Sequence, residues 1–130
     1  MNIEAFLLCD AATDSFGKLN VLGAFDTIRA KEFPVAHSQC SVALRLRMSR
    51  IETGSHKLTI HIVDEDGNFI VPPLDGNFNV GVGSPDQTTP VNIILNLQSL
   101  KIEHAGEYAI NLAIDGRQEA SLPLYVKEIA

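Results

Sequence analysis

The sequence predicts an all-β fold, in which two antiparallel sheets pack face to face as a sandwich of seven or eight strands. Three observations lead to this prediction. Several segments alternate apolar and polar residues one by one, as a strand with one buried face does. Turn-forming residues separate these segments. No segment has the helical periodicity needed to cover a parallel sheet, so two antiparallel sheets are expected to cover each other.

A single domain is expected over residues 1–130. The chain is 45% hydrophobic and 20% charged, so it can build a core without disulfides or metals. It is too short for two comfortable cores, and its low charge fraction argues against disorder. We therefore expect the chain to fold on its own.

Eight segments are expected to form strands, the first two at residues 3–9 and 19–29. The alternation is clearest in residues 40–48. The inward residues there are Cys40, Val42, Leu44, Leu46 and Met48. The outward residues are Ser41, Ala43, Arg45 and Arg47. The same period of two predicts the other strands at 57–62, 77–82, 91–98, 108–114 and 119–126.

Two segments without this alternation are expected to be loops. Residues 29–38 contain Pro34 and should pass over one end of the sandwich. Residues 84–90 are polar and should form a mobile connection.

The turn at Asp115-Gly116 is expected to join the last two strands. A two-residue loop would place the apolar residues of these strands on opposite faces. A three-residue loop with a bulge would pair Ala113 with Arg117 and bring both apolar sets to one side. The sequence therefore predicts the three-residue loop.

Charge and targeting signals restrict the classes of partner. Ten basic and sixteen acidic residues give a net charge of -6, which repels nucleic acid and anionic membranes. The sequence contains neither a secretory signal nor an apolar run of about 20 residues. We expect a cytoplasmic protein with no nucleic-acid or membrane partner, in which Cys9 and Cys40 are buried free thiols.

One motif is more specific than the alternation, namely Leu95-x-Leu97-x-x-Leu100-x-x-x-His104-x-Gly106-x-Tyr108-x-Ile110. It resembles the tyrosine corner of immunoglobulin-like domains. The resemblance implies an immunoglobulin-like β-sandwich, in which the Tyr108 hydroxyl bonds to backbone a few residues upstream. His104 replaces the usual Asp, Ile110 replaces the usual disulfide Cys, and Trp is absent. These departures favour a disulfide-free, intracellular version of the fold.

Nearly the whole chain also resembles an uncharacterised bacterial family of small single-domain proteins. The resemblance rests on residues 2–10, 17–27 and 63–67, which read NIEAFLLCD, GKLNVLGAFDT and VDEDG. It implies no activity, because none is assigned to that family.

The sequence predicts no enzyme, cofactor or metal site. His56 and His61 are five residues apart on one strand, so they point to opposite faces and cannot share an ion. Asp64, Asp66 and Asn68 begin like a calcium loop, but the glycine and the closing glutamate are missing. We interpret that segment as a turn with solvated acids.

Two surfaces are candidates for binding. Arg45 and Arg47, together with Lys57 and His61 on the next strand, form a basic patch that would bind an anion or an acidic surface. The alternative for these residues is a solvated face that guards against edge pairing.

The second surface consists of the outward residues of the last two strands, which are mostly small. Its members are Ala109, Asn111, Ala113, Ser121 and Tyr125. Small side chains make a flat sheet that another sheet can approach, and the resemblance to immunoglobulin-like domains implies a two-fold homodimer through this face. We expect a non-enzymatic interaction module that self-associates through one sheet face, with an unknown protein partner. A small-ligand or anion-binding sandwich is the alternative.

Overall fold

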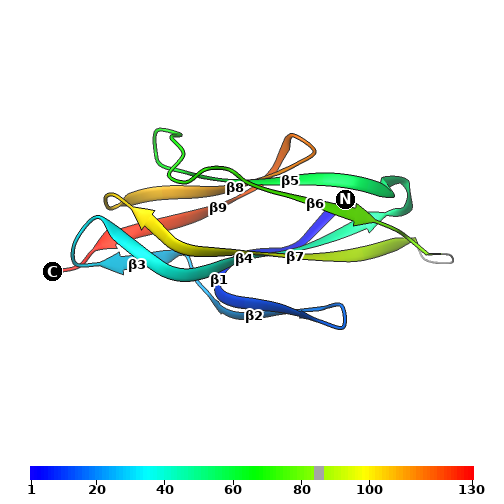
Figure 1. Cartoon of the computed structure of the whole chain (residues 1–130), viewed down its shortest axis with the longest axis horizontal. Coiled ribbons are helices and arrows are strands. Elements are labelled where there is room, and N and C mark those ends of the chain that lie inside the picture. Colours follow the sequence, from blue (N-terminus) through cyan, green and yellow to red (C-terminus); the bar gives the residue numbers. More distant parts are fainter. Residues whose placement is uncertain (84–86) are drawn as a thin grey trace. The chain divides into compact units, whose positions relative to one another are not determined.

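The computed structural model describes residues 1–83 and 87–130, and strands dominate them (Figure 1). The strands are β1 (Asn2–Ser15), β2 (Lys18–Ala24), β3 (Thr27–Ala30), β4 (Val35–Ser49), β5 (Gly54–Val63), β6 (Leu74–Val80), β7 (Thr88–Ile102), β8 (Gly106–Ile114) and β9 (Arg117–Glu128). A short 3-10 turn, η1 (Arg50–Glu52), joins β4 to β5. The described residues contain no α-helix, so the predicted all-β class is confirmed.

The strands form two sheets, as a β-sandwich requires. The first sheet has the order β2-β1-β4-β7, and the second has the order β3-β9-β8-β5-β6. β3 runs parallel to β9, whereas β8 is antiparallel to both β5 and β9. The chain divides into two compact units. One comprises Met1–Phe25, Cys40–His56 and Asn77–Asn96, and the other comprises Asp26–Gln39, Lys57–Gly76 and Leu97–Ala130.

Strand β4 has the alternation that the sequence predicts. Its five inward residues, from Cys40 to Met48, are all at most 2% exposed. Ser41 and Ala43 are buried as well, although the sequence predicts them on an exposed face. The β1–β2 hairpin returns to this face, because the Gly17 carbonyl at its tip accepts a hydrogen bond from Arg45. The hairpin therefore lies against the face of β4 that was expected to meet solvent.

The predicted strand over residues 19–29 is wrong, because two strands occupy this segment. β2 belongs to the first sheet and β3 to the second. At the junction the Phe25 amide donates to the Leu8 carbonyl, and the Asp26 carbonyl accepts from the Tyr125 amide. The chain changes sheets between these two residues, which raises the strand count from eight to nine.

The two predicted loops differ from their expected bounds. Only residues 31–34 lie outside strands in the first, because β3 ends at Ala30 and β4 begins at Val35. In the second, residues 84–86 lie outside the described residues, and Thr88 already belongs to β7.

The β8–β9 hairpin has a two-residue loop, so the predicted pairing of Ala113 with Arg117 is wrong. Arg117 pairs with Ile114 instead, and positive φ angles at Asp115 (51°) and Gly116 (80°) fit a type I′ turn. The register shifts between Leu112 and Ala113, because β9 has one extra residue opposite this step. This bulge brings the apolar residues of β8 and β9 to the same side of the sheet, which we had expected a three-residue loop to do.

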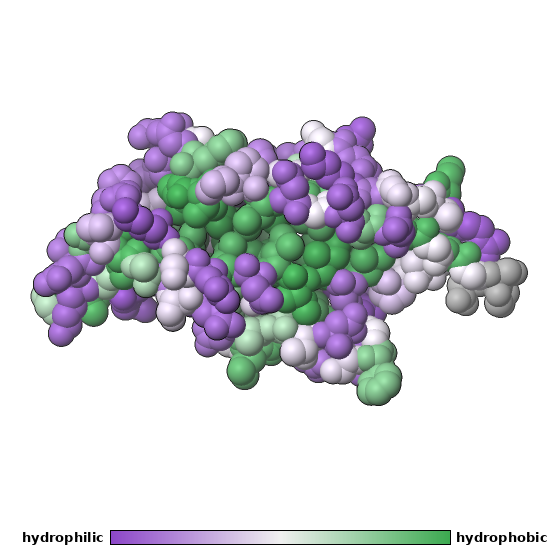
Figure 2. Space-filling model, in the orientation of Figure 1, coloured by the Kyte–Doolittle hydropathy of each residue, from purple (hydrophilic) through white to green (hydrophobic). Residues whose placement is uncertain are grey.

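Some large hydrophobic side chains remain at the surface. Phe16 at the β1–β2 turn, Ile51 in η1 and Leu22 on β2 are 104%, 94% and 70% exposed. In the view of Figure 2, hydrophobic residues reach the surface near the middle and at some places along the border.

Candidate functional site

The outward face of β5, β8 and β9 is the first candidate surface. Residues that pair directly across a sheet share one face. We call this surface the β5–β8–β9 face. The pairing places on it Thr59, His61, Val63, Ala109, Asn111, Ala113, Gln118, Ser121, Pro123 and Tyr125, with Glu107 at its end. The alternate residues on the same strands, such as Ile60, Ile110 and Leu112, are 0% exposed. The face therefore points away from the buried side of its sheet.

The middle of the β5–β8–β9 face carries no Lys, Arg, Asp or Glu. Charges begin at its rim, where Lys57 lies 3.9 Å from Asp75 and Glu107 pairs with Tyr125 across β8 and β9. Lys57 and Asp75 are more than half exposed, so their ion pair contributes little stability. An uncharged centre inside a charged rim is typical of protein interfaces.

Aromatic rings lie at two places on this face. The His61 ring meets the edge of Phe69 at a centroid distance of 4.8 Å, and Phe69 is 54% exposed. Tyr125 is half-buried on β9, beside Thr27 of β3. The structure thus brings Lys57, His61 and Tyr125 to one face, whereas the sequence assigned them to two surfaces.

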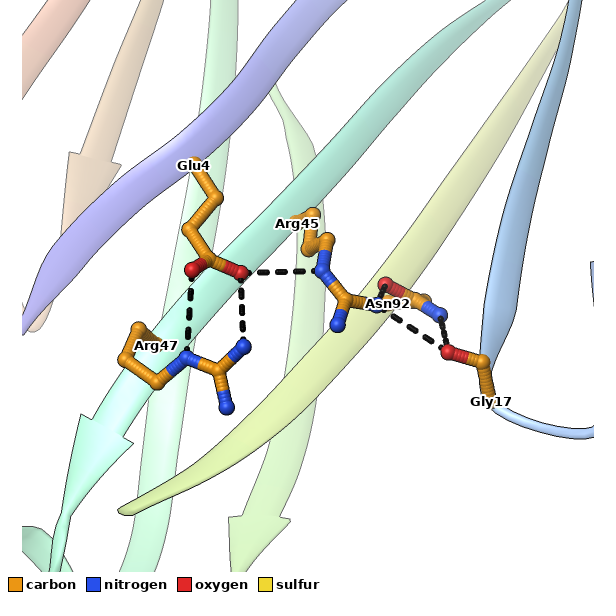
Figure 3. A network of polar contacts seen from close by, with 5 residues as sticks. All are labelled: Glu4, Gly17, Arg45, Arg47 and Asn92. Atoms are coloured by element: carbon orange, nitrogen blue, oxygen red, sulfur yellow. Dashed lines mark hydrogen bonds and ion pairs between the residues drawn. The ribbon is translucent and has the colours of Figure 1, made fainter.

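Arg45 and Arg47 do not join Lys57 and His61. The two pairs were expected on neighbouring strands, but β4 lies in the first sheet and β5 in the second. The prediction of one basic patch on adjacent strands is therefore wrong. An acid that was not expected, Glu4 of β1, lies between the two arginines (Figure 3).

A bulge in β1 brings Glu4 to the two arginines. Ile3 pairs with Leu46 and Ala5 pairs with Arg45, so Glu4 is the extra residue between them. Glu4 Oε1 accepts from Arg45 Nε at 2.9 Å and from Arg47 Nη2 at 3.1 Å. Hydrogen bonding to Arg47 and Arg45 holds the pKa of Glu4 below its usual value. The alternation in residues 3–9 contains no signal for this bulge, because a bulge depends on the partner strand.

Arg45 also bonds two further segments, the β1–β2 turn and β7 (Figure 3). Its Nη1 donates to the Gly17 carbonyl at 3.0 Å and to Asn92 Oδ1 of β7 at 3.1 Å. Asn92 Nδ2 donates to the same Gly17 carbonyl at 3.1 Å. The arginine is therefore part of a structural network that fixes the hairpin turn next to Phe16.

A depression of about 130 Å³ lies where the Asp64–Asp66 turn meets residues 104–108. Two of the carboxylates that line this depression accept hydrogen bonds from backbone amides. Asp64 Oδ1 accepts from the amides of Asp66 and Asn68, and Glu65 Oε1 accepts from the Glu107 amide at 2.9 Å. These bonds confirm the predicted turn. No group of three His, Cys, Asp or Glu side chains suited to a metal ion occurs in residues 1–83 and 87–130.

Tyr108 forms the corner bond that the resemblance implied. Its hydroxyl donates to the His104 carbonyl at 2.6 Å, and His104 Nδ1 lies 2.9 Å from the Tyr108 hydroxyl oxygen. Burial raises the pKa of Tyr108 above its usual value, so the phenol stays protonated and remains a donor. Leu100, another residue of the same motif, is 3% exposed.

The chain belongs to the DUF6941 family, a family of unknown function, whose model matches residues 4–127. A comparison with curated proteins finds no match. Within the part of the chain that the structure describes, no helix has the length and apolar character to cross a bilayer.

Among solved structures, the chain is similar to the alkylpurine DNA glycosylase AlkC of Pseudomonas fluorescens, bound to DNA that contains an abasic site analog. The TM-score is 0.51 and the identity is 10%, with 97% of this chain and 30% of that chain covered. The chain thus spans less than a third of the glycosylase. At this identity the likeness concerns the fold alone.

Proposed function

We propose that the chain is a non-enzymatic, cytoplasmic protein-interaction module that self-associates through the β5–β8–β9 face. One observation carries the proposal: the centre of this face is uncharged in a chain with 26 charged residues and a net charge of -6. Two such chains repel each other, so they associate best where neither presents a charge.

The shapes of the side chains favour the same face. Ala109, Ala113 and Ser121 are small, so a second sheet can approach closely. Tyr125 offers a large ring at low entropic cost, which is typical of residues that anchor an interface. In a two-fold dimer the same patch is used on both copies, so each tyrosine would contact the small residues of the other.

The finer identity of the module is part of this proposal. The bond from Tyr108 to the His104 carbonyl supports an immunoglobulin-like type of sandwich. A bacterial family is proposed on the sequence resemblance alone. The free, buried Cys9 and Cys40 support a reducing compartment such as the cytoplasm. The alternative, an anion site made of Arg45, Arg47, Lys57 and His61, loses its basis because the two pairs lie on different sheets.

Sedimentation of an Ala109→Arg variant at tens of micromolar tests the proposed face. Ala109 pairs with Val63 and Pro123 in its uncharged part, so an arginine there would meet its counterpart across the two-fold. We expect the assembly mass to fall by half. The matched control is Ala36→Arg, at an exposed alanine of β4, which should leave the mass unchanged.

Two results would contradict the proposed face. The first is a wild-type chain that sediments at 14.1 kDa at every concentration tested. The second is an Ala109→Arg variant with the wild-type mass.

A further inference from the structure

The strand β7 is an open edge of the first sheet. The sheet order ends at β7, which has β4 on one side and no neighbour on the other among the described strands. With 15 residues it is as long as β4, the longest internal strand of the sheet. An open edge presents unpaired backbone N–H and C=O groups to any strand of suitable sequence.

Residues 91–97 of β7 lack the features that usually protect such an edge. They read VNIILNL and contain no charged residue, proline or glycine. The other edge strands are protected. β3 has four residues, β6 follows Pro72-Pro73 and carries Asp75, and β2 begins at Lys18.

The apolar row of β7 is incompletely covered. Val91, Ile93 and Leu95 alternate along the strand and remain half-buried. The corresponding row on β4, from Val42 to Leu46, is at most 2% exposed. A strand added beside β7 would cover the rest of its apolar row.

The sequence of this segment is symmetric about Ile94. Val91 matches Leu97, Asn92 matches Asn96, and Ile93 matches Leu95 in chemical type. An antiparallel pair of identical strands with Ile94 opposite Ile94 would place each residue opposite its match. The apolar row would then continue from one copy to the other, and the asparagines would face each other on the opposite side.

We propose that β7 pairs with β7 of a second copy, antiparallel and with the two-fold axis at Ile94. The pairing joins two four-stranded sheets into one of eight strands. The absence of charge in residues 91–97 removes like-charge repulsion at the contact, although each chain carries a net charge of -6. The amide of Asn92 is already held in place by Arg45 and Gly17, so the edge is ordered before it pairs.

This contact is independent of the proposed function, because it uses β7 rather than the β5–β8–β9 face. A chain with both contacts forms an assembly larger than a dimer, since each two-fold contact joins a different part of the surface. Loss of one contact leaves a dimer held by the other.

Cysteine cross-linking tests the register. In the proposed pairing the two Cα atoms of residue 94 lie about 4.5 or 5.5 Å apart, within the range of a disulfide. Under mild oxidation we expect Ile94→Cys to form a covalent dimer. The matched control is Gln98→Cys, at an exposed position of β7, whereas Ile94 is half-buried. Its copies would be eight residues apart along the ladder, about 27 Å, so it should not cross-link.

Charge exchange at Ile94 tests the contact in solution. Ile94→Lys and Ile94→Glu each place like charges opposite one another, so each variant should lose the contact and halve the assembly mass. Mixing the two variants should restore it, because lysine then faces glutamate. Leu22→Lys, on the other edge strand of the sheet, is the control and should keep the wild-type mass.

Three results would overturn this proposal. They are equal cross-linking of the two cysteine variants, no cross-linking of Ile94→Cys, and no recovery of mass on mixing. The Ala109→Arg variant separates the two proposals. If only the proposal of the β5–β8–β9 face is wrong, Ile94→Cys still cross-links. If only the proposal of β7 pairing is wrong, Ala109→Arg is monomeric.

Discussion

At the level of single residues, the Tyr108 corner is the best-defined polar feature of the second unit. The Tyr108 hydroxyl donates to the His104 carbonyl, and His104 Nδ1 lies within hydrogen-bond distance of the hydroxyl oxygen. The backbone and the side chain of His104 therefore both contact this hydroxyl. The ring itself is only 4% exposed. The bond ties the start of β8 to the turn that precedes it.

Removal of this hydroxyl should destabilise the protein. Tyr108→Phe keeps the ring but leaves the His104 carbonyl without its donor, which should lower the free energy of unfolding by about 1 kcal/mol. Urea denaturation measures the change. Tyr125→Phe, on the half-exposed face, is the control and should have a smaller effect. Equal losses in the two variants would show that the corner bond contributes nothing.

At the level of elements, the β1 bulge and the β1–β2 hairpin depend on one another. The bulge presents Glu4 to Arg45 and Arg47, and Arg45 in turn holds the hairpin turn at the Gly17 carbonyl. Gly17 also donates its amide to Asp14 Oδ1 at 3.1 Å. The exposed Phe16 therefore sits on a turn that is held from both sides.

Arg45 and Arg47 should differ in their effect on the hairpin. Both bind Glu4, but only Arg45 reaches Gly17 in the described part of the chain. Arg45→Ala should lower the local opening energy of the hairpin by about 1 kcal/mol, which is roughly fivefold faster amide exchange in residues 14–19. Arg47→Ala is the matched control. Similar exchange in both variants would mean that the Gly17 contact does not hold the turn.

At the level of the whole molecule, both thiols are buried in the compact unit that contains Met1–Phe25 and Cys40–His56. Cys9 and Cys40 are each 0% exposed, on the neighbouring strands β1 and β4. Burial raises the pKa of Cys9 and raises that of Cys40 to about 11. The reactive thiolate is therefore scarce in the folded chain, and solvent does not reach it.

Thiol labelling should thus report unfolding of the molecule. At pH 8 the native protein should react with a thiol reagent only as fast as it opens, and unreduced protein in denaturant should release two thiols per chain. Cys40→Ser should release one. Fast labelling of the native protein would contradict the burial, and fewer than two thiols in denaturant would indicate a disulfide.

The strands and their inward residues were predictable because alternation is a local property. The inward rows on β4, β5 and β8 are buried as the alternation predicts, with Leu46, Ile60 and Ile110 at 0% exposure. The bulges were not predictable. Glu4 on β1 and the extra residue in β9 owe their positions to the strands beside them. The grouping of Arg45 with Lys57 failed for the same reason, since sequence order does not give sheet order.

The sequence by itself determined the all-β class and the inward rows, because both depend on residues that are close in the chain. The corner bond of Tyr108 was implied by the resemblance of its motif to immunoglobulin-like domains. The tertiary structure decided which strands are neighbours, that Glu4 meets Arg45 and Arg47, and that His61 shares a face with Tyr125. These features depend on pairing between distant segments. That pairing is set by the burial of the whole chain, and no short segment encodes it.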